Sequence, residues 1–124
     1  MGQGDNERTV VLFVEDEPLV RMFGADVLEE AGFEVLEAVD GDAALAVLAA
    51  RPDIDVLFTD VNMPGSLDGL DLARLVHARR PDIKLLIASG QVRLSDDDIP
   101  DAGRFLPKPY APDAIVREIR GLVA

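Results

Sequence analysis

The chain has 124 residues and a formal net charge of −12, since 24 Asp and Glu outnumber 12 Lys and Arg. That length suits one domain, and so acidic a surface repels phosphate backbones, so we expect no direct nucleic-acid binding. The absence of cysteine excludes a disulfide framework and a thiolate zinc site. The polar start does not resemble a signal peptide, and the apolar runs are too short for a transmembrane helix of roughly 20 residues, so we expect a cytoplasmic domain without membrane contact.

Apolar residues predict an alternation of strands and helices along the chain. The first strand covers 10–14, where five consecutive apolar residues are typical of a parallel strand covered on both faces. Pro18 favours the start of a helix, and Gly32 its end. The apolar residues between them recur at helical spacing and form the expected inner face of the helix: Val20, Phe23, Val27, Leu28 and Ala31.

The alternation continues through the middle of the chain. A second strand over 33–37 is only partly apolar, so we expect it to be less buried. An Ala- and Leu-rich helix follows over 40–51. A third strand over 55–59 stops at Asp60 and leads through a loop to a helix over 69–79.

The last third of the chain contains the one irregular part of the pattern. The pattern clearly predicts a fourth strand over 84–88, a short fifth strand over 105–106 and a closing helix over 112–122. The alternation requires a further helix within 91–103, where Pro100 would break it within a turn or two. We therefore expect a short or irregular fourth helix.

One tetrapeptide, Arg-Pro-Asp-Ile, occurs at 51–54 and again at 80–83, each time before an apolar strand. The offset of 29 residues is about the length of one βαβ unit, roughly 30 residues. The pattern therefore predicts an α/β fold of the (βα)5 type, a mostly parallel sheet between two helical layers. We expect one domain over 9–124, preceded by a disordered or flexible tail over 1–8.

Polar side chains follow the predicted strands and should converge in one crevice, because ligands of open α/β sheets bind at the carboxyl ends of the strands. They are Glu15, Asp16, Asp60, Asn62, Ser89 and Lys108. An all-oxygen cluster without His or Cys suits Mg²⁺ or Mn²⁺, and an ammonium and a hydroxyl beside a carboxylate nucleophile suit a phosphoryl group. An acid after a strand is, by itself, more often a helix N-cap, and a single Ser or Lys is more often a turn or solvated surface residue. Only the combination of these residues indicates a site.

The motifs at these positions resemble the receiver domain of two-component response regulators, in order and in spacing from about Thr9 to Leu122. They are Glu15-Asp16-Glu17-Pro18, Thr59-Asp60-Val61-Asn62-Met63-Pro64, Asp68-Gly69-Leu70, Ser89-Gly90 and Lys108-Pro109. The resemblance implies a flavodoxin-like three-layer sandwich with strand order 2-1-3-4-5. It also implies that the chain takes a phosphoryl group from a sensor histidine kinase or a histidine phosphotransfer protein and then switches its partner-binding surface.

The resemblance further implies a role for each site residue. Asp60 is the phosphoacceptor, and Mg²⁺ (or Mn²⁺) binds through the side chains of Asp16 and Asp60, the backbone carbonyl of Asn62 and, mainly through water, Glu15. Lys108 and Ser89 contact the phosphoryl oxygens, and the peptide bond between Lys108 and Pro109 is cis. As Ser89 moves, Phe105 turns inward, and because Phe105 has no hydroxyl its rotation depends on packing alone. Asn62 and Gln91 tune hydrolysis, and we expect a phosphoryl lifetime of seconds to minutes.

Three departures from the family pattern stand out. Glu15 replaces the commoner Asp, the loop over 64–69 is about one residue longer than in chemotaxis-type receivers, and the stretch over 89–105 is about three residues shorter. That stretch belongs to the face that receivers usually present to a downstream partner, formed by the fourth helix, the fifth strand and the last helix. The partner itself, and whether the chain is a monomer or a phosphorylation-dependent dimer, do not follow from the sequence.

Two other functions compete with the phosphorylated switch. An aspartate-nucleophile phosphohydrolase typically has a second Asp two residues after the nucleophile as general acid, and Asn62 stands there. A receiver-like module that binds partners without phosphorylation is the other alternative. We therefore expect no enzyme activity beyond self-phosphorylation and autodephosphorylation, in a stand-alone receiver or, alternatively, one excised from a longer regulator or hybrid kinase.

Overall fold

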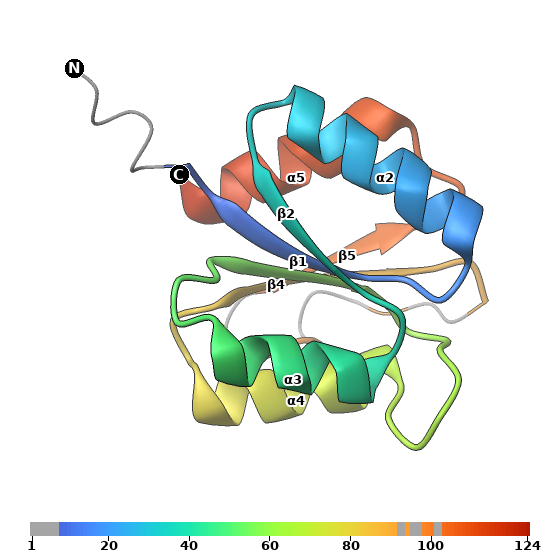
Figure 1. The fold of residues 1–124 in the computed structure, drawn as a ribbon. Helices are drawn as coiled ribbons and strands as arrows, with labels where there is room; N and C mark the ends of the chain where they lie inside the picture. Colours follow the sequence, from blue (N-terminus) through green and yellow to red (C-terminus); the bar gives the residue numbers. More distant parts are fainter. Residues whose placement is uncertain (1–7, 92–93, 95–97, 101–102) are drawn as a thin grey trace.

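The computed structural model describes residues 8–91, 94, 98–100 and 103–124, which form a single five-stranded sheet with helices on both faces (Figure 1). All neighbouring strands are parallel, and their order is β2-β1-β3-β4-β5. The predicted flavodoxin-like order is therefore confirmed. The strands are β1 Val10–Val14, β2 Glu34–Ala38, β3 Val56–Asp60, β4 Lys84–Ser89 and β5 Arg104–Pro107.

Two helices cover each face of the sheet, as Figure 1 shows, with α2 and α5 on one side and α3 and α4 on the other. Their bounds are α2 Pro18–Glu30, α3 Gly41–Ala50, α4 Gly69–Arg79 and α5 Pro112–Val123. Alternate residues of β1 enter the two cores, with Leu12 on the α3 and α4 side and Phe13 on the α2 and α5 side. The first strand is buried along its whole length, as its uninterrupted apolar run predicts. No helix in the described ranges is long and apolar enough to cross a membrane.

The described residues contain four helices, and none of these four lies between β4 and β5. The short or irregular fourth helix expected within 91–103 falls largely on 92–93, 95–97 and 101–102, which lie outside the described residues. The expected tail over 1–8 also lies outside them, apart from Arg8.

The predicted inner face of α2 is correct for Leu28 and wrong for Val20 and Phe23. Leu28 is fully buried, whereas Val20 is 39% exposed and Phe23 is 58% exposed. The helix instead contacts the sheet through small residues: a Cβ atom at Gly24 would lie only 2.6 Å from the ring of Phe13. So close an approach leaves no room for a side chain at position 24, and the larger apolar side chains of the first turns face outward.

Candidate functional site

The carboxyl ends of the strands bring three of the predicted polar residues together. Asp60 and Ser89 are the last residues of β3 and β4 rather than the residues after them, and Glu15 follows β1 directly. Backbone hydrogen bonds continue the sheet into this edge, from Glu15 N to Ala38 O at 3.0 Å and from Lys108 N to Ser89 O at 3.0 Å. The site side chains therefore project from backbone that the sheet holds in place.

Lys108 connects the acidic side chains. Its Nζ donates a hydrogen bond to Asp60 Oδ2 at 2.9 Å and lies 3.9 Å from Glu15 Oε1. The side chains of Glu15 and Asp60 are only 5% and 13% exposed, so these charges meet where solvent screens them little. The peptide bond from Lys108 to Pro109 is cis.

Burial and the neighbouring charges shift two pKa values in the site. Burial raises the pKa of Glu15, and the charges of Asp60 and Asp16 add to this effect, although a hydrogen bond from Glu17 N and the charge of Lys108 oppose it. Burial lowers the pKa of Lys108, but its hydrogen bond to Asp60 and the charges of Asp60 and Glu15 together outweigh burial, and the net shift is upward. Lys108 is therefore an ammonium at neutral pH.

The remaining predicted residues lie around this centre. Asp16 is exposed beside Glu15, and the buried Ser89 Oγ accepts a hydrogen bond from Gln91 N at 3.2 Å. Asn62 Nδ2 donates to Gln91 Oε1 at 3.2 Å, so the two amide side chains are in contact at the exposed rim. Phe105 is half-buried and packs against the core beneath α3 and α4.

The donor set suits a hard divalent cation, since every side chain in it offers oxygen and three carboxylates exceed the single ammonium in charge. Among the described residues, however, no three His, Cys, Asp or Glu side chains are gathered closely enough to hold a metal ion by themselves. The residues therefore fit a cation that takes two carboxylates and completes its shell with backbone carbonyl and water, the set in which Mg²⁺ usually binds.

Sequence reasoning missed the role of Gly69 in the site. Its N–H donates to Val61 O at 2.8 Å, and a Cβ atom here would lie 2.1 Å from Asp60 O. Asp68 caps the helix that follows, accepting from Asp71 N at 2.8 Å while Asp71 accepts from Asp68 N at 3.3 Å. Only the Asp-Gly pair before an apolar helix hinted at this contact, by which the start of α4 touches the backbone of Asp60.

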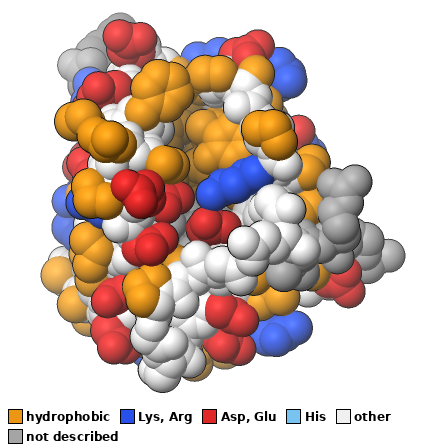
Figure 2. Space-filling view, turned by 90° about the vertical axis from the view of Figure 1, so that its right-hand side faces the viewer, with side chains coloured by type: hydrophobic (Ala, Val, Ile, Leu, Met, Phe, Trp, Pro, Cys, Tyr) orange, Lys and Arg blue, Asp and Glu red, His pale blue; other side chains and the backbone are white. Residues whose placement is uncertain are grey.

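An apolar hollow of about 560 Å³ lies beside Lys108, with Val20 and Phe23 of α2 on one side and Tyr110 on the other. Figure 2 shows hydrophobic side chains around a hollow on this face, with basic and acidic side chains at its border. Leu19 and Met22 on α2 are also exposed, by 69% and 57%. Most of the large exposed apolar side chains of the described residues thus belong to the first turns of α2, next to the acidic site.

Comparison with known proteins gives a consistent result. A family model described as the response regulator receiver domain matches residues 11–120. The response regulator receiver protein CpdR of Brucella abortus is 32% identical over 91% of this chain and 95% of its own length. The sensor kinase CckA of the same organism is 37% identical over 82% of this chain, and the nitrogen assimilation regulatory protein NtrX of Azorhizobium caulinodans is 33% identical over 86%. The chain spans only 11% of that CckA and 24% of that NtrX.

Solved structures agree with the sequence relatives. The receiver domain of a hybrid histidine kinase CckA superposes with a TM-score of 0.80 at 33% identity, over 93% of this chain and 99% of that domain. A response regulator receiver protein from Sinorhizobium medicae gives a TM-score of 0.86 at 25% identity, over 95% of this chain and 96% of its own.

Proposed function

Because this chain belongs to the response regulator receiver domain family, we propose that Asp60 is the residue that accepts the phosphoryl group. The observation that carries this proposal is the 2.9 Å hydrogen bond from Lys108 Nζ to Asp60 Oδ2, beside the buried Glu15. An acid with a protonated lysine at its carboxylate is poised to receive an anionic group, since the ammonium can pass to a phosphoryl oxygen with little movement.

In the transfer, a carboxylate oxygen of Asp60 forms a bond to phosphorus while the bond from phosphorus to an imidazole nitrogen of the donor breaks. The electron pair of that bond remains on the donor histidine, which leaves. Lys108 offsets the negative charge on the phosphoryl oxygens throughout. The donor is a histidine kinase or a histidine phosphotransfer protein.

Mg²⁺, or Mn²⁺, when bound neutralises the carboxylates and the incoming phosphoryl oxygens. The residues that would hold it are Glu15, Asp16, Asp60 and Asn62. Two observations support a cation at this place. Carboxylates outnumber ammonium groups, and the pKa of Glu15 is raised, mainly by burial and further by the charges of Asp60 and Asp16.

Phosphorylation adds about −1.5 to −2 charges at Asp60 and new acceptor oxygens. The Ser89 hydroxyl, at the end of the neighbouring strand, would donate to one of them, and Phe105 on β5 would turn toward the space that Ser89 leaves. The downstream partner would then bind at the face that includes β5 and α5, and this chain would act as a monomer or as a phosphorylation-dependent dimer.

The contact between Asn62 and Gln91 supports a role for both in hydrolysis, because two exposed amides at the rim can orient a water molecule toward the phosphorus. We expect the phosphoryl group to survive for seconds to minutes. Asn62 stands where a phosphohydrolase has its general acid, and an amide cannot serve as one.

The apolar surface of α2 supports the view that the phosphodonor docks over the hollow beside Lys108. Four large apolar side chains of α2 are exposed, Leu19, Val20, Met22 and Phe23, and two of them, Val20 and Phe23, line the hollow. A continuous apolar patch next to a reactive group is typical of an interaction surface.

The test is phosphorylation by acetyl phosphate with Mg²⁺, followed by intact mass. The wild-type chain should gain one phosphoryl group with Mg²⁺ and none when EDTA is added. Asp60→Asn should gain none under either condition. Asp42→Asn, an exposed acid on α3, is the matched control and should behave as wild type. Incorporation into Asp60→Asn to the wild-type extent would overturn the assignment. A folded wild-type protein that gains nothing would favour a module that binds partners without phosphorylation.

A further inference from the structure

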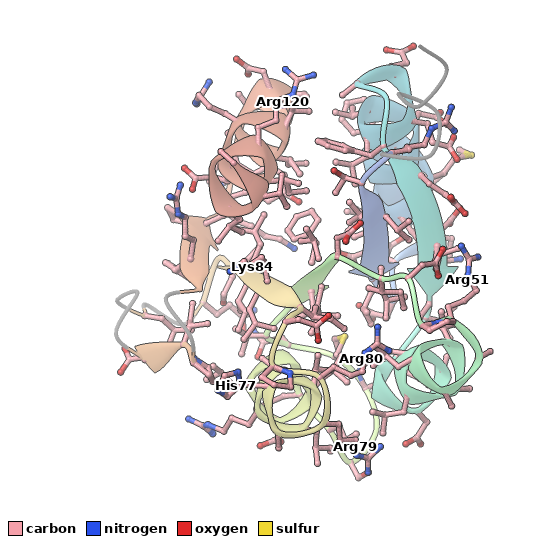
Figure 3. The ribbon with its side chains drawn as sticks, turned by 90° about the vertical axis from the view of Figure 1, so that its left-hand side faces the viewer. Arg51, His77, Arg79, Arg80, Lys84 and Arg120 are labelled. Atoms are coloured by element: carbon pink, nitrogen blue, oxygen red, sulfur yellow. The ribbon has the colours of Figure 1, made fainter. Side chains whose placement is uncertain are left out.

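A second groove, of about 270 Å³, lies between α3 and α4 at the ends of the two helices farthest from Asp60. It is lined by Leu45, Leu48, Ala49, Val76, Arg79 and Arg80. Pockets for drug-sized ligands usually measure about 300–1,000 Å³, so this groove suits one large apolar side chain better than a cofactor. In Figure 3, Arg80 lies between α3 and α4, and Arg79 lies at the outer side of α4.

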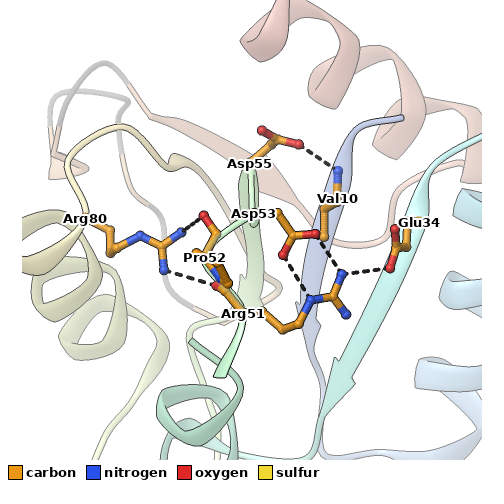
Figure 4. Close-up of polar contacts among 7 residues, drawn as sticks. All are labelled: Val10, Glu34, Arg51, Pro52, Asp53, Asp55 and Arg80. Carbon is orange, nitrogen blue, oxygen red and sulfur yellow. Dashed lines mark hydrogen bonds and ion pairs between the residues drawn. The ribbon is translucent and has the colours of Figure 1, made fainter. Parts of the chain in front are cut away.

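Arg80 is held in place by backbone carbonyls. Its guanidinium donates to Leu48 O at 3.3 Å, to Arg51 O at 3.3 Å and to Pro52 O at 2.9 Å, and Figure 4 shows the last two contacts. All three acceptors are carbonyls, and no carboxylate among the described residues lies within ion-pair distance of Arg80. Three of its five N–H donors are used, so two remain for an acceptor from outside.

Arg79 adds a second positive charge to the groove. Its side chain is exposed in the last turn of α4 and forms no ion pair with any residue that the structure describes. Five other cationic side chains lie within 3.3 Å of a carboxylate: Arg21, Arg51, Arg104, Lys108 and Arg117. Like Arg79, the remaining described cations form no ion pair with the described residues, but of these only Arg79 and Arg80 line the groove. The groove thus combines an apolar floor with two guanidinium groups that form no ion pair with the described residues, and it has no acidic side chain in its described lining.

We propose that this groove binds an acidic segment of a partner protein. One large apolar side chain of the segment lies on Leu45, Leu48 and Ala49, and flanking carboxylates pair with Arg79 and Arg80. Charge complementarity selects this occupant, because the groove is lined by Arg79 and Arg80 and by no acidic side chain, on a chain whose net charge is −12. The 11 residues of α4, about 16 Å of helix, separate the groove from Asp60, so the proposal does not rest on phosphorylation.

The probe is an eight-residue, fluorescein-labelled peptide of glutamates with one central phenylalanine, titrated with the full chain and followed by fluorescence anisotropy. Mg²⁺ and phosphodonor are omitted, so that failure here is separate from failure of the phosphorylation assay. We expect saturable binding that becomes about tenfold weaker in Arg79→Glu. Replacing the phenylalanine of the peptide with alanine should also weaken binding.

Arg74→Glu is the matched control, because Arg74 is exposed on the same helix and lies outside the groove. It should change the affinity less than twofold, and Ala49→Glu, which places a like charge in the groove, should weaken binding as Arg79→Glu does. Circular dichroism checks that each variant is folded. Equal losses in Arg74→Glu and Arg79→Glu, or no saturable binding in the wild type, would overturn the proposal. Self-association of the chain that Arg79→Glu abolishes would also overturn it, by assigning the groove to a second copy.

Discussion

Replacing Gly69 with alanine should force the start of α4 and the end of β3 apart. An added Cβ atom would lie 2.1 Å from Asp60 O, 2.7 Å from Asp60 C and 2.9 Å from Val61 Cα. All three are backbone atoms, so no side-chain rotation can relieve the overlap. Ordinary contact begins at 3.4 Å, so the two segments must separate by about 1.3 Å, which also disturbs the 2.8 Å hydrogen bond from Gly69 N to Val61 O.

The cost of this displacement follows from its size. Overpacking in a well-packed interior costs about 1–3 kcal/mol, and a clash with backbone belongs at the upper end, so we expect a loss of about 3 kcal/mol. At about 4 °C per kcal/mol for a domain of this size, Tm should fall by about 12 °C. Because a misplacement of about 1 Å can cost roughly 10²-fold in rate, phosphorylation of Asp60 by acetyl phosphate should slow by about that factor.

Gly65→Ala provides the matched comparison. Gly65 has a φ of +96° and no atom within 4 Å of an added Cβ, so alanine there meets only the strain of a left-handed residue, about 1–2 kcal/mol. Its Tm should fall by about 4–8 °C, with the phosphorylation rate unchanged. Thermal unfolding and timed intact-mass measurements distinguish the two variants. If Gly69→Ala proves no less stable than Gly65→Ala, or is phosphorylated at the wild-type rate, the contact does not position Asp60.

Three further substitutions test other contacts. Burial, and to a smaller extent the charges of Asp60 and Asp16, raise the pKa of Glu15 in the folded chain. Protonated Glu15 therefore contributes to the free energy of unfolding below its ordinary pKa of about 4.5, and this contribution is lost as pH rises through the raised value. Glu15→Gln should therefore be more stable than the wild type at pH 7 in EDTA, and the difference should vanish near pH 4. Urea unfolding that gives the same difference at both pH values, or none at pH 7, would contradict this. Asp68→Ala removes a helix cap and should cost about 1 kcal/mol in the same assay, with Asp68→Asn restoring most of it. Arg80→Met removes three hydrogen bonds to carbonyls and should cost about 1–3 kcal/mol, against less than about 0.5 kcal/mol for Arg79→Met.

The arrangement of strands and helices could be predicted because each buried strand is an uninterrupted apolar run. All five residues of β1 are buried, and four of the five residues of β3. The observed ends of β3 and β4 lie one residue beyond the predicted ends, because the sheet continues past the last apolar residue. Asp60 pairs with Ala88, and Ser89 pairs with Pro107. Polarity marks where the apolar run stops, whereas backbone pairing marks where the strand stops.

Features that depend on a distant neighbour could not be predicted. The outward position of Phe23 follows from the ring of Phe13 beneath Gly24, and nothing within α2 encodes that ring. The repeated tetrapeptide shows the same dependence. Arg51 pairs with Asp53 and Glu34, whereas Arg80, at the equivalent position, donates only to carbonyls at the end of α3. Identical local sequences therefore have different contacts, because one precedes β3 near an edge strand and the other lies against a helix end.

The receiver site gathers unfavourable charges where the fold is best able to hold them. Burial and two neighbouring carboxylates raise the pKa of Glu15, and Lys108 can offset only part of the negative charge. The acids stand at the ends of β1 and β3, whose side chains fill both cores, so hydrophobic burial fixes the backbone positions that repulsion alone would separate. An acidic cluster on such a support can change its charge by phosphorylation without loss of the sheet, because the energy that holds the strands together does not come from the cluster.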